Sequence, residues 1–213
     1  MLLATGTVRL CQLHLILPNP LDMSNATAQE ALLEILLKKS VMFGDFTLAS
    51  GAKSDLYVDC RLTTLDAKGA FLVGQVMFPI VRQAEQELGI KADGVGGLTM
   101  GADPVALAIS IASHLAEPES PLNAYSVRKE AKKHGRQKLV EGNFKAGDSV
   151  VVVDDVITTG GSTIKAIEAI EAEGGKVAFV LVLLDREEGG KANIEAKGYK
   201  VYPALTRSML IKK

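Results

Sequence analysis

The sequence has few cysteines, no long apolar run and almost no net charge, and each shortage excludes a class of protein. Its two cysteines, Cys11 and Cys60, have neither metal-ligand nor CxxC spacing, which favours a reduced, cytoplasmic environment. No apolar run is long enough to span a bilayer. The net charge of -1 argues against nucleic acid or an acidic membrane as a partner. The 213 residues therefore have the composition of a compact soluble enzyme.

Neither an internal repeat nor a low-complexity linker divides the chain, so we expect one domain over residues 23–213. The apolar stretch within residues 1–22 is short, interrupted and followed by no cleavage pattern, so a secretory signal is not expected. Residues 1–22 are instead expected to be a dispensable N-terminal extension. Met23 is a natural start, and Thr27 with Glu30 predicts a capping box for the next helix. The alternative is an N-terminal strand or arm that packs on the core.

Hydrophobic periodicity alternates between helix and strand along the rest of the chain. Helices are expected at 27–39, 67–89 and 104–115 and after residue 163; strands are expected at 56–62, 93–98, 122–127, 150–157, 177–184 and 199–205. Asp66 is expected to cap the second helix, and Pro79 inside it can kink or break it. Strands that alternate with helices indicate an α/β fold with a parallel sheet and right-handed crossovers.

The most informative run starts in a buried strand and ends in a helix. Four β-branched residues, 150–153, predict a strand buried on both faces, and Asp154 and Asp155 follow at its carboxyl end. The Thr and Gly turn at 158–162 then exposes backbone N–H groups at the start of a helix, where anions bind. Carboxylates beside such a turn suit a ligand with hydroxyls and a phosphate, such as a sugar phosphate. The alternative is an ordinary strand-turn-helix with solvated acids and hydroxyl caps.

This run resembles the signature of the type I phosphoribosyltransferases, which use 5-phosphoribosyl 1-diphosphate (PRPP). The resemblance implies an α/β fold in which helices flank a mainly parallel central sheet and a small N-terminal hood is added. It also implies that Asp154 and Asp155 contact the ribose hydroxyls and that residues 158–162 wrap the 5-phosphate. The substrate-binding residues expected in this run are Asp154, Asp155, Val156, Ile157, Thr158, Thr159, Gly160, Gly161 and Ser162. Mg²⁺ is the expected cofactor, with no side chain assigned as a metal ligand.

Residues 46–59, in a hood expected at about 43–62, resemble the N-terminal hood of the orotate phosphoribosyltransferases. In that family a Ser-Gly turn and the following strand close over the flat pyrimidine. The alternative is a surface hairpin. The glycine-rich segment 94–104 resembles the family's pyrophosphate loop, although a plain strand-to-helix turn would also use Gly and Pro.

The segment 128–138 holds six basic residues and one His against one acid, enough positive charge to bind a polyanion. A strand precedes it and 139–142 follows, so it should be a long loop between paired strands. It resembles the mobile loop of the orotate phosphoribosyltransferases, which reaches the pyrophosphate and crosses into the neighbouring subunit of a dimer. The binding residues that this implies are Arg128, Lys129, Lys132 and His134. The catalytic set that it implies is Lys132, His134, Asp154 and Asp155. The alternative is a solvated helix face.

The sequence departs from the best-known members of this family at Ala49 and Met100, where those members have Lys. Both changes remove positive charge near the expected diphosphate, and Lys53 is the candidate that could replace part of it. Orotate carries a carboxylate, which needs a cation. The resemblance assigns this role to Arg186, and it places Thr158 facing the base.

The expected function is that of an orotate phosphoribosyltransferase, a pentosyltransferase that makes orotidine 5-phosphate and diphosphate from orotate and PRPP in pyrimidine biosynthesis. The expected assembly is a homodimer with active sites shared across its interface, without a nucleic-acid or membrane partner. Two alternatives remain at this point. One is a purine phosphoribosyltransferase, which the hood and the basic loop argue against. The other is a non-catalytic regulator that keeps the PRPP fold and binds RNA, which the near-neutral charge argues against.

Overall fold

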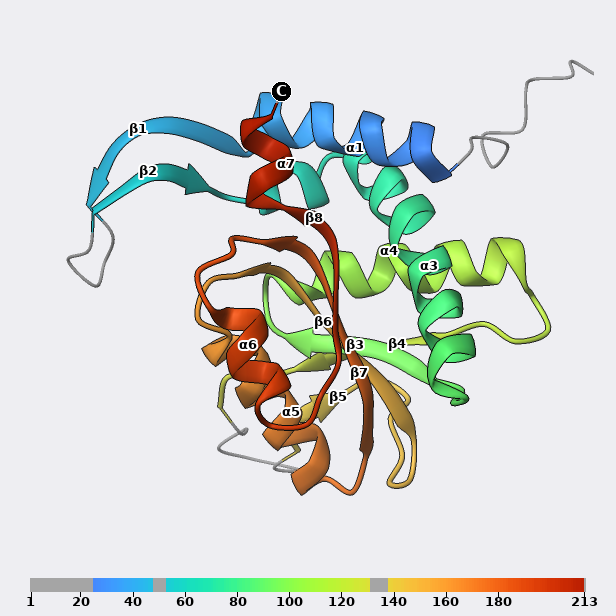
Figure 1. The fold of residues 1–213 in the computed structure, drawn as a ribbon. Helices are drawn as coiled ribbons and strands as arrows, with labels where there is room; N and C mark the ends of the chain where they lie inside the picture. The colour runs from blue at the N-terminus through green and yellow to red at the C-terminus, as the bar shows by residue number, and fades with distance from the viewer. Residues whose placement is uncertain (1–24, 48–52, 131–137, 213) are drawn as a thin grey trace, which may run out of the picture.

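The computed structural model describes residues 25–47, 53–130 and 138–212, whose helices and strands are labelled in Figure 1. In chain order these elements are α1 (Asn25–Lys39), β1 (Val41–Thr47), β2 (Lys53–Val58), α2 (Arg61–Thr64), α3 (Ala67–Leu88), β3 (Gly94–Leu98), α4 (Ala102–Ala116), β4 (Asn123–Val127), β5 (Val140–Glu141), β6 (Ser149–Ile157), α5 (Gly161–Ala172), β7 (Lys176–Asp185), α6 (Gly190–Glu195), β8 (Val201–Thr206) and α7 (Arg207–Ile211). The predicted extension at 1–22 lies outside the described residues and stays a prediction.

The main sheet has six strands in the order β5-β4-β3-β6-β7-β8. All neighbours in it are parallel except β4 and β5, which are antiparallel. The chain leaves β3 toward one edge of the sheet and leaves β6 toward the other. The carboxyl ends of these two central strands therefore form a topological switch point, where open α/β sheets bind ligands. The predicted α/β class with a mainly parallel sheet is confirmed.

Strand β6 is buried on both faces, as its run of valines predicts. Val151 and Val153 pack in a core formed with α1, α3 and α4, whereas Val150 and Val152 pack in a second core formed with α5 and α6. Figure 1 shows these two groups of helices on opposite sides of the sheet. Because side chains alternate along a strand, this pattern also fixes the faces on which the following residues lie.

Strands β1 and β2 form a separate antiparallel hairpin in the segment for which a hood is predicted, and this hairpin is called the hood below. The register of the hairpin shifts between Phe43 and Phe46, and Gly44 has a φ of +158° there. The rings of Phe46 and Tyr57 pack across the hairpin with centroids 5.7 Å apart. In Figure 1 the hairpin projects beyond the main sheet on the side of α7.

Helix α3 has the predicted N-cap, and the proline inside it does not break it. The Asp66 carboxylate accepts hydrogen bonds from the backbone N–H groups of Lys68 (3.1 Å) and Gly69 (3.0 Å), which is the predicted cap. Pro79 lies inside the helix without breaking it. The helix ends at Gly89, whose φ of +65° is left-handed, the conformation that glycine adopts at a C-cap.

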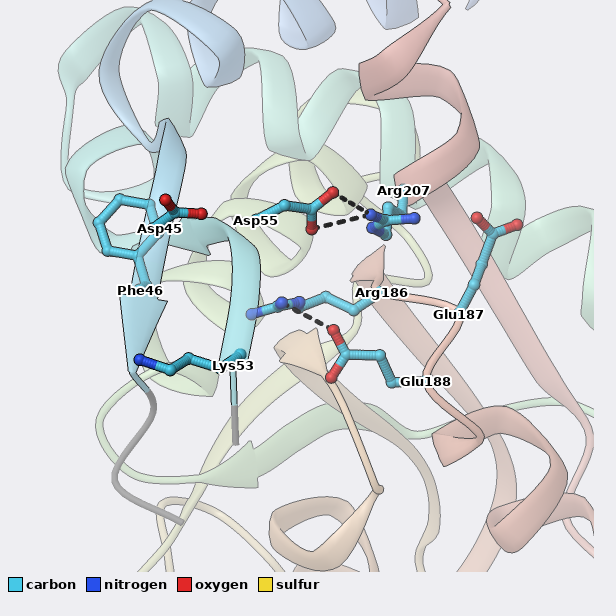
Figure 2. Close-up of a pocket in the computed structure, with 8 residues that line it drawn as sticks. All are labelled: Asp45, Phe46, Lys53, Asp55, Arg186, Glu187, Glu188 and Arg207. Carbon is cyan, nitrogen blue, oxygen red and sulfur yellow. Dashed lines mark hydrogen bonds and ion pairs between the residues drawn. The ribbon is translucent and has the colours of Figure 1, made fainter. Parts of the chain in front are cut away.

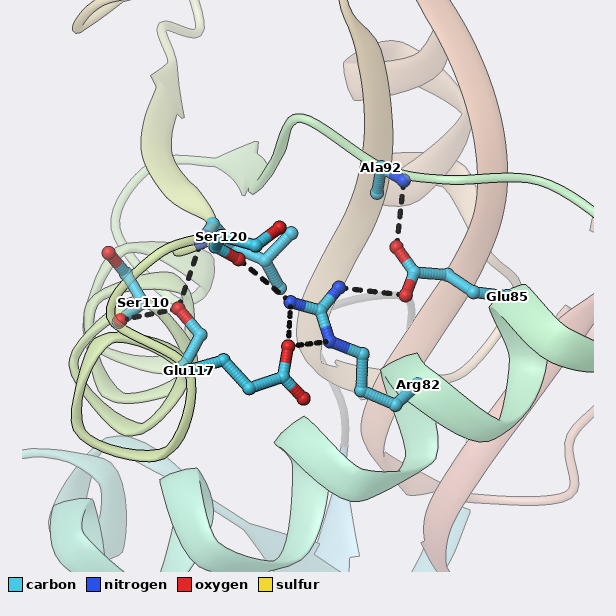
Figure 3. Close-up of polar contacts among 8 residues, drawn as sticks. Arg82, Glu85, Ala92, Ser110, Glu117 and Ser120 are labelled. Carbon is cyan, nitrogen blue, oxygen red and sulfur yellow. Dashed lines mark hydrogen bonds and ion pairs between the residues drawn. The ribbon is translucent and has the colours of Figure 1, made fainter.

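Arg82 of α3 joins this helix to the connection between α4 and β4 (Figure 3). Its guanidinium binds Glu85 Oε2 (2.7 Å), Glu117 Oε2 (3.0 Å) and the Ser120 carbonyl (2.9 Å). Glu85 in turn accepts a hydrogen bond from the Ala92 N–H (2.7 Å), just before β3. A partly buried network of this kind fixes the entry to the central strand, because each charge has its partners.

Some predicted boundaries are wrong. Helix α1 begins at Asn25, so Thr27 lies inside the helix and does not act as its N-cap. The strand predicted at 56–62 is β2, which ends at Val58 and is followed by the short helix α2. The last strand starts at Val201 and not at residue 199. Short elements such as α2 and α6 depend on tertiary packing more than on periodicity, which is why the sequence pattern missed them.

Candidate active site

The alternation along β6 sends its two acidic side chains to opposite faces of the sheet. Asp154 follows the face of Val150 and Val152, toward α5, whereas Asp155 follows the face of Val151 and Val153, toward the start of α4. The contacts agree, because Asp154 bonds to a residue of α5 and Asp155 lies against the loop before α4. The pair thus occupies the switch point between β3 and β6.

Asp154 is only 5% exposed. Its Oδ2 accepts a hydrogen bond from the Thr163 hydroxyl (2.7 Å), and its Oδ1 accepts one from the Asp155 N–H (3.1 Å). Burial raises the pKa of Asp154 to about 7, although the Thr163 hydrogen bond opposes the shift. The carboxyl group is therefore poised between its protonated and ionised forms near neutral pH.

Asp155 is also buried, and burial raises the pKa of its carboxyl group, against the effect of the N–H of Val156, which donates to Oδ1 (3.1 Å). The loop before α4 passes very close to it. A Cβ added to Gly101 would lie 2.3 Å from Asp155 Oδ1, so only glycine fits there. The positive charge of Arg61 lowers the Asp155 pKa and opposes the effect of burial.

A cavity of about 390 Å³ contains both carboxyl groups. The other walls come from the end of β2 and the residues after it, the loop after β3, the start of the basic loop, and the first turn of α5. The lining residues are Tyr57, Val58, Asp59, Cys60, Arg61, Leu98, Thr99, Met100, Gly101, Lys129, Asp154, Asp155, Val156 and Ser162. Burial raises the pKa of the Cys60 thiol well above its usual range, so this group stays protonated and is no nucleophile.

The turn after β6 is backed by α6. Gly160 has a left-handed φ of +83°, and a Cβ there would lie 3.0 Å from Ile194 Cγ1 and 3.1 Å from the Gly190 carbonyl. The side-chain amide of Asn193 donates to the Thr159 carbonyl (3.0 Å). The turn is thus held from behind, and its backbone N–H groups stand at the N-terminus of α5, where the helix dipole favours an anion.

A second and larger cavity, of about 720 Å³, lies between the hood and the loop after β7 (Figure 2). Arg186 is 5% exposed, donates to the Leu56 carbonyl (3.2 Å) and forms an ion pair with Glu188 (2.7 Å). Arg207 binds both carboxylate oxygens of Asp55 in the hood (2.9 and 2.8 Å). Cationic side chains from three separate elements, Lys53, Arg186 and Arg207, therefore line this cavity.

Glu187 holds the loop that carries Arg186. It has a left-handed φ of +56°, which is unusual for a residue other than glycine. Its N–H donates to Asp185 Oδ1 (2.8 Å), and its carboxylate accepts from the N–H (2.7 Å) and hydroxyl (2.6 Å) of Ser208 at the start of α7. The two hydrogen bonds from Ser208 lower the pKa of Glu187 and tie the loop to the C-terminal helix.

The structure describes only the two ends of the basic loop. The Arg128 N–H donates to the Leu139 carbonyl (2.8 Å), and the flanking strands β4 and β5 pair as expected. The loop itself stays a prediction. The Arg128 side chain faces Glu141 (3.4 Å) and lines a third cavity, of about 640 Å³, next to the first turns of α5. Lys129 lines this cavity and the one that contains the Asp pair. Lys132 and His134 lie outside the described residues.

The structure brings five of the fourteen predicted site residues together in one cavity. Asp154, Asp155, Val156, Ser162 and Lys129 line one cavity. Arg186 lines the second cavity, beside the hood, and Arg128 the third. The Ile157 side chain is buried in the core, so its contact with a ligand would be through its backbone.

The sequence reasoning missed three residues that line these cavities or contact the Asp pair. Thr163 stands one residue after the predicted phosphate-binding turn, so its helical position could have indicated a contact with Asp154. Arg61 follows β2 at a position where a strand was expected, and Arg207 pairs with an acid 152 residues away. Neither of these two has a local signal, because each acts across the tertiary structure.

The fold and the site together match one class of enzyme. Residues 73–201 match the model of the phosphoribosyl transferase domain, which covers β3, the Asp pair and the turn before α5. A solved adenine phosphoribosyltransferase of Leishmania donovani shares this fold, with a TM-score of 0.55 at 17% identity over 84% of this chain and 80% of that one.

Curated relatives identify the family within this class. The orotate phosphoribosyltransferase of Rhodopirellula baltica is 41% identical over 175 residues, which are 82% of this chain and 90% of that protein. That of Aquifex aeolicus is 38% identical over 186 residues, or 86% of this chain and 97% of that protein. The solved Mycobacterium tuberculosis enzyme in complex with PRPP covers 86% of this chain and 98% of its own, with a TM-score of 0.70 and 34% identity. The chain belongs to the orotate phosphoribosyltransferase family of the type I phosphoribosyltransferases.

Proposed function

We propose that this chain transfers the 5-phosphoribosyl group of PRPP to orotate and releases orotidine 5-phosphate and diphosphate. It is an orotate phosphoribosyltransferase (EC 2.4.2.10), a glycosyltransferase of pyrimidine biosynthesis. The observation that carries the proposal is the cavity in which Asp154 and Asp155 meet the first turn of α5. It offers carboxylates for the ribose hydroxyls and a helix N-terminus for the 5-phosphate.

The mechanism follows from the charges. Displacement of diphosphate from C1 of the ribose gives the ring cationic character, as in other glycosyl transfers with oxocarbenium-like transition states. Asp154 and Asp155 bind the hydroxyls and place negative potential close to that cation. Loop 98–101, with Gly101 against Asp155, lets the backbone approach the leaving group. Lys129 is the described cation at the start of the basic loop, and Lys132 and His134 are proposed to reach the same diphosphate.

Magnesium fits this donor set. Mg²⁺ is usually held by one or two carboxylates together with substrate phosphates, rather than by an all-protein cage. The described residues contain no group of three or more His, Cys, Asp or Glu side chains placed for a metal. We therefore propose that Mg²⁺ enters with PRPP and that Asp154 and Asp155 are its nearest protein carboxylates. When bound, the ion would neutralise charge on the diphosphate.

The cavity beside the hood suits orotate. Arg186 is buried, planar and directed into that cavity (Figure 2), and a guanidinium can bind a carboxylate with two parallel hydrogen bonds. Its present partner, Glu188, is 37% exposed on its side chain and could give way to the orotate carboxylate. Phe46, whose ring packs against Tyr57, lines this cavity and gives it an aromatic face for the pyrimidine.

Orotate consumption, followed by absorbance with PRPP and Mg²⁺, tests the reaction. We expect activity with orotate and very little with uracil, which has the same ring without the carboxylate. Arg186→Met should raise KM for orotate while KM for PRPP changes little. Equal use of uracil, or no orotate consumption by the wild-type enzyme, would contradict the proposed function.

We also propose a homodimer, which a second copy would form by covering the outer face of α3 and α4. The apolar side chains exposed on this face are Leu65, Phe71, Leu107, Ile111 and Leu115. They border an apolar hollow of about 420 Å³. Contiguous exposed apolar patches of this kind mark interaction sites on soluble proteins. Symmetric dimers are also the commonest assembly of soluble proteins.

Complementation tests whether the active sites are shared. One inactive variant would be Lys132→Ala and the other Asp154→Asn with Asp155→Asn. If the basic loop acts on the partner's site, each heterodimer has one intact site and one doubly damaged site, so random pairing recovers about a quarter of the wild-type activity. If the loop acts on its own chain, every site in the heterodimer carries one lesion. No recovery from verified heterodimers would contradict the shared site.

A further inference from the structure

Arg61 stands where two cavities meet. It lines the cavity of about 390 Å³ that contains the Asp pair, and it also lines an adjoining cavity of about 490 Å³. Met100 and Asp59 line both of these cavities as well. A ligand that occupies the first cavity and extends into the second would therefore pass Arg61 and Met100.

The charges of this cavity are unbalanced for a polyanion. Its described lining includes the acids Asp59, Asp154 and Asp155 but only two cations, Arg61 and Lys129. The loop after β3 contributes Met100, whose side chain is 60% exposed and carries no charge. A leaving diphosphate beside this loop needs a cation from elsewhere, because its negative charge grows as the bond to the ribose breaks.

Arg61 is placed and shaped for this role. Its guanidinium is held by Asp59 through Nε to Oδ1 and Nη2 to Oδ2, both 2.8 Å, which fixes the plane of the fork. Half of the side chain (50%) stays exposed, so a ligand can reach it. Arg61 lines the same cavity as Asp154 and Asp155, and its charge lowers the pKa of Asp155.

We propose that Arg61 binds the diphosphate of PRPP and supplies the positive charge that the loop at 98–101 lacks in this chain. The proposal rests on the proposed function and adds a binding residue to it. In this arrangement Asp59 is a positioning residue that orients the guanidinium before the substrate arrives. Arginine suits the role because its fork can bind two phosphate oxygens at once while one edge stays on Asp59.

Arg61→Gln is the direct test. We expect KM for PRPP to rise about tenfold to a hundredfold, the usual effect of losing a charge-assisted hydrogen bond, while KM for orotate stays within about threefold. Binding of inorganic pyrophosphate with Mg²⁺, measured by calorimetry, should weaken by a similar factor. Lys200→Gln is the matched control, because it removes an exposed cation that only pairs with Glu87 at 3.9 Å. It should change neither KM.

A second variant moves the positive charge from residue 61 to residue 100. Arg61→Gln combined with Met100→Lys places a cation at another residue that lines the same two cavities and should recover most of the lost PRPP affinity. Met100→Lys alone should bind PRPP at least as well as the wild type. Failure of the double variant to recover affinity, at an unchanged melting temperature, would contradict the proposal.

Removing Arg61 leaves Asp59 without its ion-pair partner, and that carboxylate could itself repel PRPP. Arg61→Gln with Asp59→Asn separates the two causes. The proposal predicts that the double variant keeps the raised KM for PRPP, whereas full recovery would assign the loss to the unpaired acid and overturn it. A wild-type enzyme that consumes orotate beside an unaffected Arg61→Gln variant would overturn only this inference. An inactive wild-type enzyme would overturn the proposed function.

Discussion

The cavity at the Asp pair and the cavity beside the hood are held together in different ways. The first is built on β6, which is buried on both faces and hydrogen-bonded to a parallel strand on each side. The second is closed by contacts between separate elements, such as Arg207 with Asp55 and Glu187 with Ser208. Most of these side chains are exposed.

Because the two cavities are supported differently, substitutions in them should differ in their effects. The core supports the groups proposed to bind ribose and phosphate. The exposed ion pairs that close the cavity beside the hood can exchange partners at little cost, because each contributes only about 0–1 kcal/mol. Substitutions at the Asp pair should therefore have large effects, and those at the exposed ion pairs of the hood should have small ones.

The largest effect is expected at the Asp pair. Asp154→Asn with Asp155→Asn should lower kcat/KM for PRPP by about a thousandfold or more, because both the hydroxyl contacts and the negative potential near C1 are lost. The orotate absorbance assay measures this. The variant should still fold, since both side chains keep their size. A loss below about tenfold would mean that the pair lies outside the reacting centre.

The next effect concerns the turn before α5. Gly160→Ala and Gly89→Ala both place a side chain at a left-handed φ, so each should cost about 1 kcal/mol of stability. Only Gly160→Ala should also raise KM for PRPP, because its Cβ meets Ile194 and shifts the phosphate-binding turn. Denaturant unfolding and PRPP titrations compare the two. Equal KM values for PRPP would mean that the turn does not bind phosphate.

A smaller effect concerns the dependence of stability on pH. The folded protein holds the Asp154 proton up to a pKa of about 7, against 3.8 for an ordinary Asp, so folding is favoured by protonation. The wild type should lose stability as the pH rises through this window. Asp154→Asn has no such proton, so its melting temperature should exceed that of the wild type at pH 8, and the difference should shrink toward pH 4. A difference that stays constant with pH would contradict the raised pKa.

The smallest effect is expected at the hood. Asp55→Asn and Arg207→Gln should each raise KM for orotate only slightly. A double-mutant cycle should give a coupling energy of about 0.2–1 kcal/mol, since the two side chains are 74% and 32% exposed. Thermal unfolding of the four proteins measures this coupling. A coupling above about 2 kcal/mol would mean that the hood is as firmly held as the core.

The sequence predicted the first cavity better than the second, and the reason is physical. The valine run, the Asp pair and the glycine turn are contiguous, so local periodicity and turn chemistry describe them almost completely. Asp55 and Arg207, in contrast, are 152 residues apart, and no local rule brings them together. Glu187 was also missed, because its left-handed backbone depends on Ser208, which approaches from another element. Boundaries failed where short helices such as α2 form only on a finished core.

Helix α4 begins at the loop beside Asp155, and its outer face carries the exposed Leu107, Ile111 and Leu115. One end of this helix thus lies at the proposed active site, and its outer side forms the proposed contact with a second copy. It follows that the specific activity should depend on the total enzyme concentration and fall on dilution below the dissociation constant of the dimer. Enzyme diluted into an assay would then show a progress curve that slows as the subunits separate.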